Sequence, residues 1–333
     1  MHTFEFIRPA DPASAVATAA QTKTAQQGAD VRFVAGGTTL LDLMKLNVET
    51  PARLIDINRL PLDKVEATPD GGLKIGATVR NADLARHPTV QRDYSVLSQA
   101  ILNGASAQLR NMATTAGNLL QRTRCMYFRD TAMPCNKREP GTGCPAITGS
   151  NRMLAILGTS EHCIATNPSD MCVAMAALEA TIHVLGAKGS RVIPMGDFHL
   201  LPGSTPNRET VLEPGDLITH VTLPPPIAGS KQIYLKLRDR ASYEFALASA
   251  AVVITVASGS VTKARFALGG VGTKPWRSPE AEAALVGKPA NAANFRKSAE
   301  AAIRHAKPQS ENGFKIELAK RCLTQALNMA MAT

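Results

Sequence analysis

The sequence predicts an α+β protein made of a two-part α/β region followed by a separate C-terminal α+β unit. Short strand-like runs alternate with helix-like runs through the first part of the 333 residues. A triple proline at residues 224–226 then interrupts the chain, because three prolines can neither extend a strand ladder nor start a helix interior. A β-hairpin pattern and several helical patterns follow it. We therefore expect domains at residues 1–60, 61–226 and 231–333, with a loop inserted at residues 122–167.

The first domain should contain strands at residues 4–8 and 31–34, separated by an alanine-rich helix. A Gly-Gly-Thr-Thr turn at residues 36–39 follows the second strand. Apolar residues with helical spacing begin at Leu40, so the expected order is strand, glycine turn, helix.

The second domain should begin near strand-like residues 54–57 and 73–76 and continue through helix-like runs at 81–85 and 95–102. Three later runs read as strands, and the first two are joined by Gly-Ala-Lys-Gly, which is typical of a hairpin. These runs cover residues 181–185, 191–194 and 217–223.

In the C-terminal domain, two strand-like runs flank Ser-Gly-Ser at residues 258–260 and predict a second hairpin. Ser278 and Pro279 suit the first positions of a helix, and two further helices are expected at residues 291–305 and 314–331.

The composition excludes several classes of function. The chain has a formal charge of +10, but its Lys and Arg residues are scattered and only 4% of its residues are aromatic, so we expect no nucleic acid partner. A solvated basic surface, or a face that docks acidic subunits, explains the charge more simply. No apolar run approaches the roughly 18–20 residues of a membrane span. The N-terminus lacks the basic head and apolar core of a secretory signal.

Four cysteines fall in the insertion, in the pattern C-x9-C-x8-C-x18-C: Cys125, Cys135, Cys144 and Cys163. The surrounding stretch is rich in Pro, Gly, Asn and Arg and needs an internal staple, which iron–sulfur ligation, zinc or disulfides could provide. Disulfides are disfavoured without an export signal, and no C-x-x-C pair supports a zinc knuckle, so we favour an iron–sulfur centre. Cys172 and Cys322 lie on apolar helix faces and should be buried thiols.

The glycine turn at residues 36–39 matches neither the dinucleotide G-x-G-x-x-G spacing nor a P-loop. Its adjacent glycines and its two threonines could still approach a pyrophosphate, although an isolated Gly-Gly is more often a purely structural turn. A second small-residue turn at 113–118, together with Ser169 and Asp170, offers further groups for a nucleotide. Asp170 could instead be a carboxylate that stabilises a helix N-terminus.

Other chemistries have no support in the sequence. The seven histidines form no H-x3-H or H-E-x-x-H pattern, and His162 beside Cys163 reads as a bystander. No G-x-S-x-G motif is present, so hydrolysis by a serine nucleophile is not expected.

Taken together, four segments resemble the FAD-binding medium subunit of the xanthine-oxidase family of molybdenum hydroxylases. They are FVAGGTTL (33–40), QLRNMATTAGNL (108–119), PSD (168–170) and KLRDRASYEFAL (236–247). The four-cysteine insertion is similar to that of the aldehyde oxidoreductase type, whose flavin subunit carries a [4Fe-4S] cluster. NLLQRTRC (118–125), PCNK (134–137) and GGVGTKPWR (269–277) resemble that type more than the 4-hydroxybenzoyl-CoA reductase type.

The resemblance implies a two-part α/β FAD-binding domain of the PCMH type and a C-terminal domain of the CO-dehydrogenase flavoprotein type. The implied cluster ligands are Cys125, Cys135, Cys144 and Cys163. The implied FAD-binding residues are Arg32, Phe33, Val34, Ala35, Gly36, Gly37, Thr38, Thr39, Leu40, Thr114, Gly117, Asn118, Asp170 and Lys236. Of these, residues 32–40 would cradle the pyrophosphate, and Asp170 and Lys236 would hold the ribityl or flavin end. The second turn reads Thr-Ala-Gly-Asn where many relatives have another glycine, so a close approach at Ala116 is less secure.

The resemblance also implies partners: a small subunit with two [2Fe-2S] clusters and a large subunit with the molybdopterin cofactor, where aldehyde is oxidised. This chain would pass the electrons to an external acceptor and would carry no catalytic residue beyond the flavin. We expect it to reach the periplasm with a signal-bearing partner, with a cytoplasmic enzyme as the alternative. Two rival functions are the flavin subunit of a 4-hydroxybenzoyl-CoA-reductase-like enzyme and a non-enzymatic, zinc-stapled interaction subunit.

Overall fold

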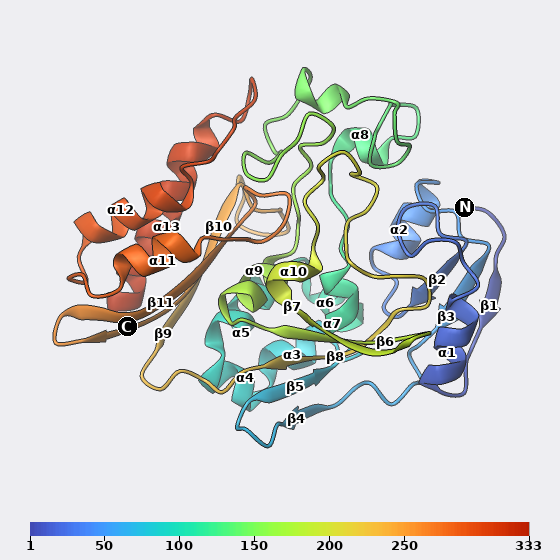
Figure 1. Ribbon diagram of the computed structural model, residues 1–333, viewed down its shortest axis with the longest axis horizontal. Helices are drawn as coiled ribbons and strands as arrows, with labels where there is room; N and C mark the ends of the chain where they lie inside the picture. The colour runs from blue at the N-terminus through green and yellow to red at the C-terminus, as the bar shows by residue number, and fades with distance from the viewer. Residues whose placement is uncertain (333) are drawn as a thin grey trace.

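The computed structural model describes residues 1–332, and it has three sheets that follow one another along the chain (Figure 1). The first sheet is parallel, with the order β1-β3-β2. Its strands are β1 (Glu5–Ile7), β2 (Val31–Val34) and β3 (Arg53–Asp56). The helices are α1 (Pro12–Ala19), which starts at a capping box between Asp11 and Ser14, and α2 (Leu40–Lys45), which follows the glycine turn.

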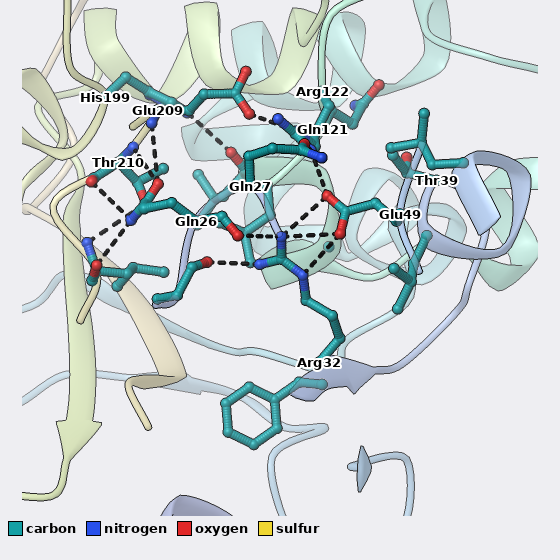
Figure 2. Close-up of a pocket in the computed structure, with 18 of the residues that line it drawn as sticks. Gln26, Gln27, Arg32, Thr39, Glu49, Gln121, Arg122, His199, Glu209 and Thr210 are labelled. Atoms are coloured by element: carbon teal, nitrogen blue, oxygen red, sulfur yellow. Dashed lines mark hydrogen bonds and ion pairs between the residues drawn. The ribbon is translucent and has the colours of Figure 1, made fainter. Parts of the chain in front are cut away.

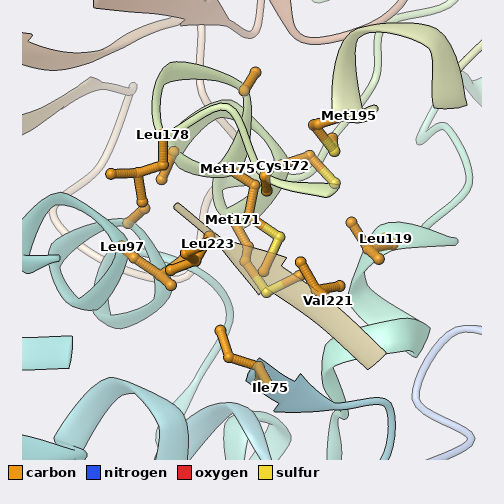
Figure 3. Close-up of a cluster of buried hydrophobic side chains, with 14 of the residues drawn as sticks. Ile75, Leu97, Leu119, Met171, Cys172, Met175, Leu178, Met195, Val221 and Leu223 are labelled. Atoms are coloured by element: carbon orange, nitrogen blue, oxygen red, sulfur yellow. The ribbon is translucent and has the colours of Figure 1, made fainter. Parts of the chain in front are cut away.

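The second sheet is antiparallel and has the order β4-β5-β8-β6-β7. Its strands are β4 (Val65–Ala67), β5 (Leu73–Gly76), β6 (Thr181–Gly186), β7 (Gly189–Pro194) and β8 (Leu217–Leu223). Seven helices belong to the same part of the chain: α3 (Asn81–Arg86), α4 (Pro88–Asp93), α5 (Ser95–Asn103), α6 (Ala107–Met112), α7 (Thr115–Leu119), α9 (Asp170–Ala177) and α10 (Met195–Phe198). All eight residues of α9 are buried, and Met171 and Met175 pack with Ile75, Leu97 and Val221 in the largest core (Figure 3).

The third sheet is antiparallel, with the order β12-β11-β10-β9. Its strands are β9 (Lys231–Leu237), β10 (Ala248–Ala257), β11 (Ser260–Gly269) and β12 (Trp276–Arg277). The helices α11 (Pro279–Leu285), α12 (Ala292–Ala302) and α13 (Phe314–Ala332) supply its core with buried side chains such as Phe295 and Leu323. Helix α12 ends three residues before the expected boundary at residue 305, because residues 303–306 form turns.

The insertion contains little regular structure, only α8 (Met126–Arg129) and a 3-10 turn at Pro145–Ile147. In Figure 1 it lies in green between the red C-terminal helices and the blue N-terminal unit. The C-terminal part of the insertion packs against the third unit. Leu157 pairs with Gly272, and Ile156 and Leu157 are fully buried in the C-terminal core. The third unit therefore holds the end of the insertion in place.

Lys315, at the start of α13, strengthens this contact. Its side chain is fully buried, and its ammonium donates to the carbonyls of Met153 (2.9 Å), Leu154 (3.1 Å) and Gly270 (2.8 Å). Three donors thus meet three acceptors that belong to two distant segments.

Within residues 1–332, no helix is both long and apolar enough to cross a membrane.

Candidate functional site

A large cavity, which we call the main cleft, lies where the glycine turn after β2, the start of α7 and the segment 199–216 meet. It has a volume of about 1610 Å³, including its open mouth. All nine residues from Arg32 to Leu40 line it, as do Thr114 and Gly117. Eleven of the fourteen residues that the resemblance implies for FAD therefore surround one cavity.

A second cavity of about 1000 Å³, the side cleft, holds the other three: Asn118, Asp170 and Lys236. The two clefts share five lining residues: Thr38, Thr39, Gly117, Gln121 and Pro168. The glycine turn therefore stands at the junction of the two clefts, where a long ligand would pass from one to the other.

The glycine turn needs both of its glycines. Gly37 has φ = +71°, a conformation that side chains with a Cβ rarely adopt. A Cβ on Gly36 would lie 2.0 Å from the carbonyl oxygen of Met112, so only glycine allows this turn to meet the end of α6. Arg80 holds the contact by donating to that same carbonyl and to Asn58, which in turn donates to the carbonyl of Ala35.

The main-chain N–H groups of the turn are available to a ligand. Within residues 1–332, those of Gly37, Thr38 and Thr39 donate no hydrogen bond. They lie beside the N-terminus of α2, so they offer an anion several donors at the place where the two clefts join.

Asp170 and Lys236 form a buried ion pair at the side cleft, with Nζ and Oδ2 2.8 Å apart and side chains that are 8% and 1% exposed. The Tyr234 hydroxyl contacts the other carboxylate oxygen at 2.6 Å and Ser249 at 2.9 Å. Burial raises the pKa of Asp170, an effect that the Lys236 ammonium and the Tyr234 hydroxyl oppose. Ser169 rather than Asp170 caps α9, because its hydroxyl accepts from the N–H of Cys172.

Tyr234 was not among the residues expected from the sequence. It lies two positions before Lys236 on β9, and strand residues two apart share one face of the sheet. The strand itself was not expected, although the alternation of Ile233, Leu235 and Leu237 is a signal that could have found it.

A chain of buried and half-buried charges, which we call the charge chain, borders the main cleft (Figure 2). The guanidinium of Arg32 contacts both oxygens of Glu49 at 3.0 Å and donates to the carbonyls of Ala25 and Gln26. Glu49 also accepts from Arg122, which bonds Glu209 through Nε. Because its guanidinium is engaged in this way, Arg32 builds the wall of the cleft and does not reach out into it.

The charge chain ends at Lys137, whose ammonium lies 2.9 Å from Glu209 and 3.0 Å from the carbonyl of Pro206. Although burial raises it, the Arg122 and Lys137 cations lower the pKa of Glu209 to about 2. Glu49 and Glu209 were not among the residues expected from the sequence. No sequence signal joins these two glutamates, which are far apart in the chain.

The four cysteines of the insertion line one small cavity of about 290 Å³, the cysteine pocket. Cys125, Cys135 and Cys163 are buried and Cys144 is half-buried, and all four thiols are free. Within the described residues, no three His, Cys, Asp or Glu side chains are placed to hold a single metal ion. Four thiolates on one zinc would lie about 3.8 Å apart, given a Zn–S bond of about 2.3 Å. The arrangement therefore surrounds a shared cavity and does not match a single-ion site.

Burial raises the pKa of Cys125 to about 12, and it raises the pKa values of Cys144 and Cys163 as well. A centre that binds thiolates must therefore supply positive charge of its own. His162 lines the pocket but is exposed, and its carbonyl accepts from Asn136. Cys172 and Cys322 are fully buried outside the pocket, as expected.

Because His199, which lines the main cleft, is buried, we expect the protein to lose stability in acid. Its Nε2 lies 2.9 Å from the carbonyl of Leu119, and burial lowers its pKa to about 4 from an unfolded value of 6.5. The unfolded chain binds the extra proton first, so the stabilisation is complete above about pH 6.5 and is lost as the pH falls towards 4. We expect a loss of about 3 kcal/mol over this range. Urea unfolding at several pH values should show a flatter profile for His199→Gln, and an unchanged profile would contradict the assignment.

Comparison with known proteins decides the family. The domain described as "FAD binding domain in molybdopterin dehydrogenase" matches residues 2–226, and the "CO dehydrogenase flavoprotein C-terminal domain" matches residues 233–330. The chain belongs to the FAD-binding medium subunits of the molybdenum hydroxylase family. It is therefore a subunit of an oxidoreductase, and the α+β fold expected from the sequence is confirmed.

Individual relatives agree with this family. The chain is 54% identical over 333 residues to the aldehyde oxidoreductase FAD-binding subunit PaoB of Escherichia coli, covering 100% of this chain and 99% of the relative. It is 27% identical to the carbon monoxide dehydrogenase medium chain of Hydrogenophaga pseudoflava, covering 99% and 97% of the two chains. A solved structure of carbon monoxide dehydrogenase from Hydrogenophaga pseudoflava matches with a TM-score of 0.77 at 28% identity and covers 99% of this chain and 98% of its own.

Proposed function

We propose that this medium subunit holds FAD across the main and side clefts and a [4Fe-4S] cluster in the cysteine pocket. It would pass electrons from aldehyde oxidation on a partner subunit to an external acceptor. The observation that carries the proposal is the position of the glycine turn, which stands at the junction of two clefts lined by all fourteen implied residues. FAD supplies two-electron chemistry that can be divided into single-electron steps, and the chain supplies its orientation.

In this arrangement the free N–H groups at residues 37–39 would bind the pyrophosphate at the junction. One cleft would receive the adenosine and the other the ribityl and flavin groups. The Asp170–Lys236 pair and Asn118 favour the side cleft for the flavin end, because a fixed ammonium and an amide can hydrogen-bond to polar ring and sugar atoms.

Four thiols line the cysteine pocket, and four cysteines are the ligand set of a [4Fe-4S] cluster, which supports the proposal. We expect Cys135→Ser to remove most of the iron and acid-labile sulfide, since Cys135 is a buried member of the set. Iron analysis and visible absorption measure the loss, and Cys172→Ser is the matched control for a buried thiol outside the pocket. Unchanged iron in the Cys135 variant, or zinc in place of iron in the unmodified chain, would sink the cluster proposal.

We further propose a heterotrimer with a small subunit that carries two [2Fe-2S] clusters and a large molybdopterin subunit that oxidises the aldehyde. Support comes from the relatives, which are named as FAD-binding subunits or medium chains of aldehyde oxidoreductase and carbon monoxide dehydrogenase. Purification of the tagged chain from its host, followed by metal, pterin and flavin analysis, tests this assembly. A chain that purifies alone with its flavin would contradict it.

We propose that the complex is exported to the periplasm with a signal-bearing partner. Cluster assembly on four free thiols needs reducing conditions, so the chain should load its cofactors before export. Fractionation should find the chain in the cytoplasm when it is expressed alone and in the periplasm when all subunits are present. A complete complex that stays in the cytoplasm would refute export.

A further inference from the structure

The main cleft and the cysteine pocket have a common wall. Three residues, Lys137, Cys163 and Ala165, line both cavities. Cys163 is a candidate cluster ligand, and Lys137 is the last member of the charge chain. A movement of these residues in one cavity therefore changes the lining of the other cavity as well.

The charge chain connects this wall to the strand that carries the glycine turn. From the cysteine side, Lys137 contacts Glu209, Glu209 contacts Arg122, Arg122 contacts Glu49, and Glu49 contacts Arg32 on β2. Each carboxylate lies between two cations, and Glu49 and Lys137 are buried, so displacing a neighbour of either would leave a buried charge without its partner.

The charge chain also contacts the insertion on one side and the segment that holds Gln26 on the other. The Arg122 guanidinium lies over the ring of Phe128, on α8 of the insertion, at 4.6 Å from the ring centre. On the other side, the main-chain N–H of Glu209 donates to the Gln26 side chain at 3.0 Å. Gln26 and Arg122 both line the main cleft.

The charges of the chain do not balance. Arg32, Arg122 and Lys137 carry three positive charges, whereas Glu49 and Glu209 carry two negative charges, which leaves one positive charge. Lys137 is the terminal cation and stands at the wall of the cysteine pocket. A thiolate-bound centre in that pocket would supply the missing negative charge.

We infer that Glu209, with Lys137 and Arg122, couples occupancy of the cysteine pocket to the affinity of the main cleft for its flavin nucleotide. When the pocket holds a thiolate centre, the positive charge of Lys137 is neutralised by that centre on one side and by Glu209 on the other. The charge chain then keeps Arg32 and Gln26 in position. When the pocket is empty, the surplus charge loosens the wall. By linkage, FAD strengthens retention of the centre by the same factor. The inference rests on the proposed function, because it needs both groups to bind.

The test compares FAD affinity of the full-length chain before and after its iron is removed with a chelator. Fluorescence titration with FAD gives a Kd for each form. We expect iron removal to weaken FAD about tenfold in the unmodified chain, within the range usual for coupled sites. In Glu209→Gln the charge chain is interrupted, so the Kd values for FAD before and after iron removal should differ by less than about twofold.

A merely structural role for Glu209 would shift both Kd values and leave their ratio intact, so the ratio is the informative readout. Glu317→Gln is the matched control, because Glu317 also pairs with several cations, but on the surface of α13. It should keep the tenfold ratio. Lys137→Met gives a second route if Glu209→Gln fails to fold, and Lys137→Arg should retain the coupling.

Two failures are distinguishable. A purified chain without iron or without flavin binding would refute the proposed function. If the protein binds both iron and flavin but its FAD affinity does not change when iron is removed, the coupling is wrong and the proposed function stands. A tenfold ratio that persists in Glu209→Gln or in Lys137→Met would overturn it as well.

Discussion

Replacing Asp170 by alanine should lower the free energy of unfolding by about 3–5 kcal/mol. This is the usual cost of removing one partner of a buried ion pair and leaving the other charge unpaired. Within residues 1–332, the Lys236 ammonium would keep the carbonyl of Asn103, at 3.0 Å, as its hydrogen-bond acceptor. The Tyr234 hydroxyl would lose its bond to the carboxylate as well. Denaturant unfolding of the FAD-free chain measures the loss, so that flavin binding does not contribute to it.

The double variant Asp170→Leu with Lys236→Met separates stability from flavin binding. Replacing both charges by apolar groups is often close to neutral for stability, so the double variant should be more stable than the single one. It should still bind FAD weakly, because the side cleft has lost its ammonium. A loss below about 1 kcal/mol in Asp170→Ala would mean that this residue acts only as a helix N-terminal carboxylate.

A methyl group on Gly36 should weaken FAD binding about 10- to 100-fold, which corresponds to the roughly 1–3 kcal/mol typical of overpacking. The added Cβ would lie 2.0 Å from the Met112 carbonyl, so the glycine turn and the end of α6 must separate. That movement would displace the N–H groups at the junction of the clefts. FAD titration of Gly36→Ala measures the change.

Gly196→Ala is the matched control for Gly36→Ala. Gly196 is exposed, and a Cβ built on it meets nothing within 4 Å. Its FAD affinity should equal that of the unmodified chain. Normal flavin binding by Gly36→Ala would show that the turn can relax without consequence for the ligand.

Much of the fold could be predicted because each segment carried a local signal. The β6–β7 hairpin pairs Gly186 with Gly189, as its Gly-Ala-Lys-Gly turn suggested, and β10 and β11 meet at the Ser-Gly-Ser turn. Strand β4 and helix α4 were missed because β4 has no buried residue and α4 buries only Val90, so neither carries an apolar pattern. Strand β9 was missed although Ile233, Leu235 and Leu237 alternate along it and pack together at the C-terminal core.

The candidate site could be predicted where each segment carried a motif of its own. Residues 32–40 line one cleft as a single segment. The contact between Arg122 and Glu209 instead joins residues 87 positions apart, and the one between Arg32 and Glu49 depends on how two loops meet. Such ion pairs arise from the packing of whole units. A single sequence therefore shows which residues are charged but not which of them meet.

The contact between Lys315 and the exit of the insertion has a consequence for biosynthesis. A chain leaving the ribosome completes the first two sheets before residue 315 is made, so these sheets can form while the insertion still lacks its anchor. Met153 and Leu154 gain their buried ammonium only after α13 emerges. We therefore expect cofactor insertion into the cysteine pocket to be a late, post-translational event, and truncated chains that lack α13 to leave this loop exposed to proteases.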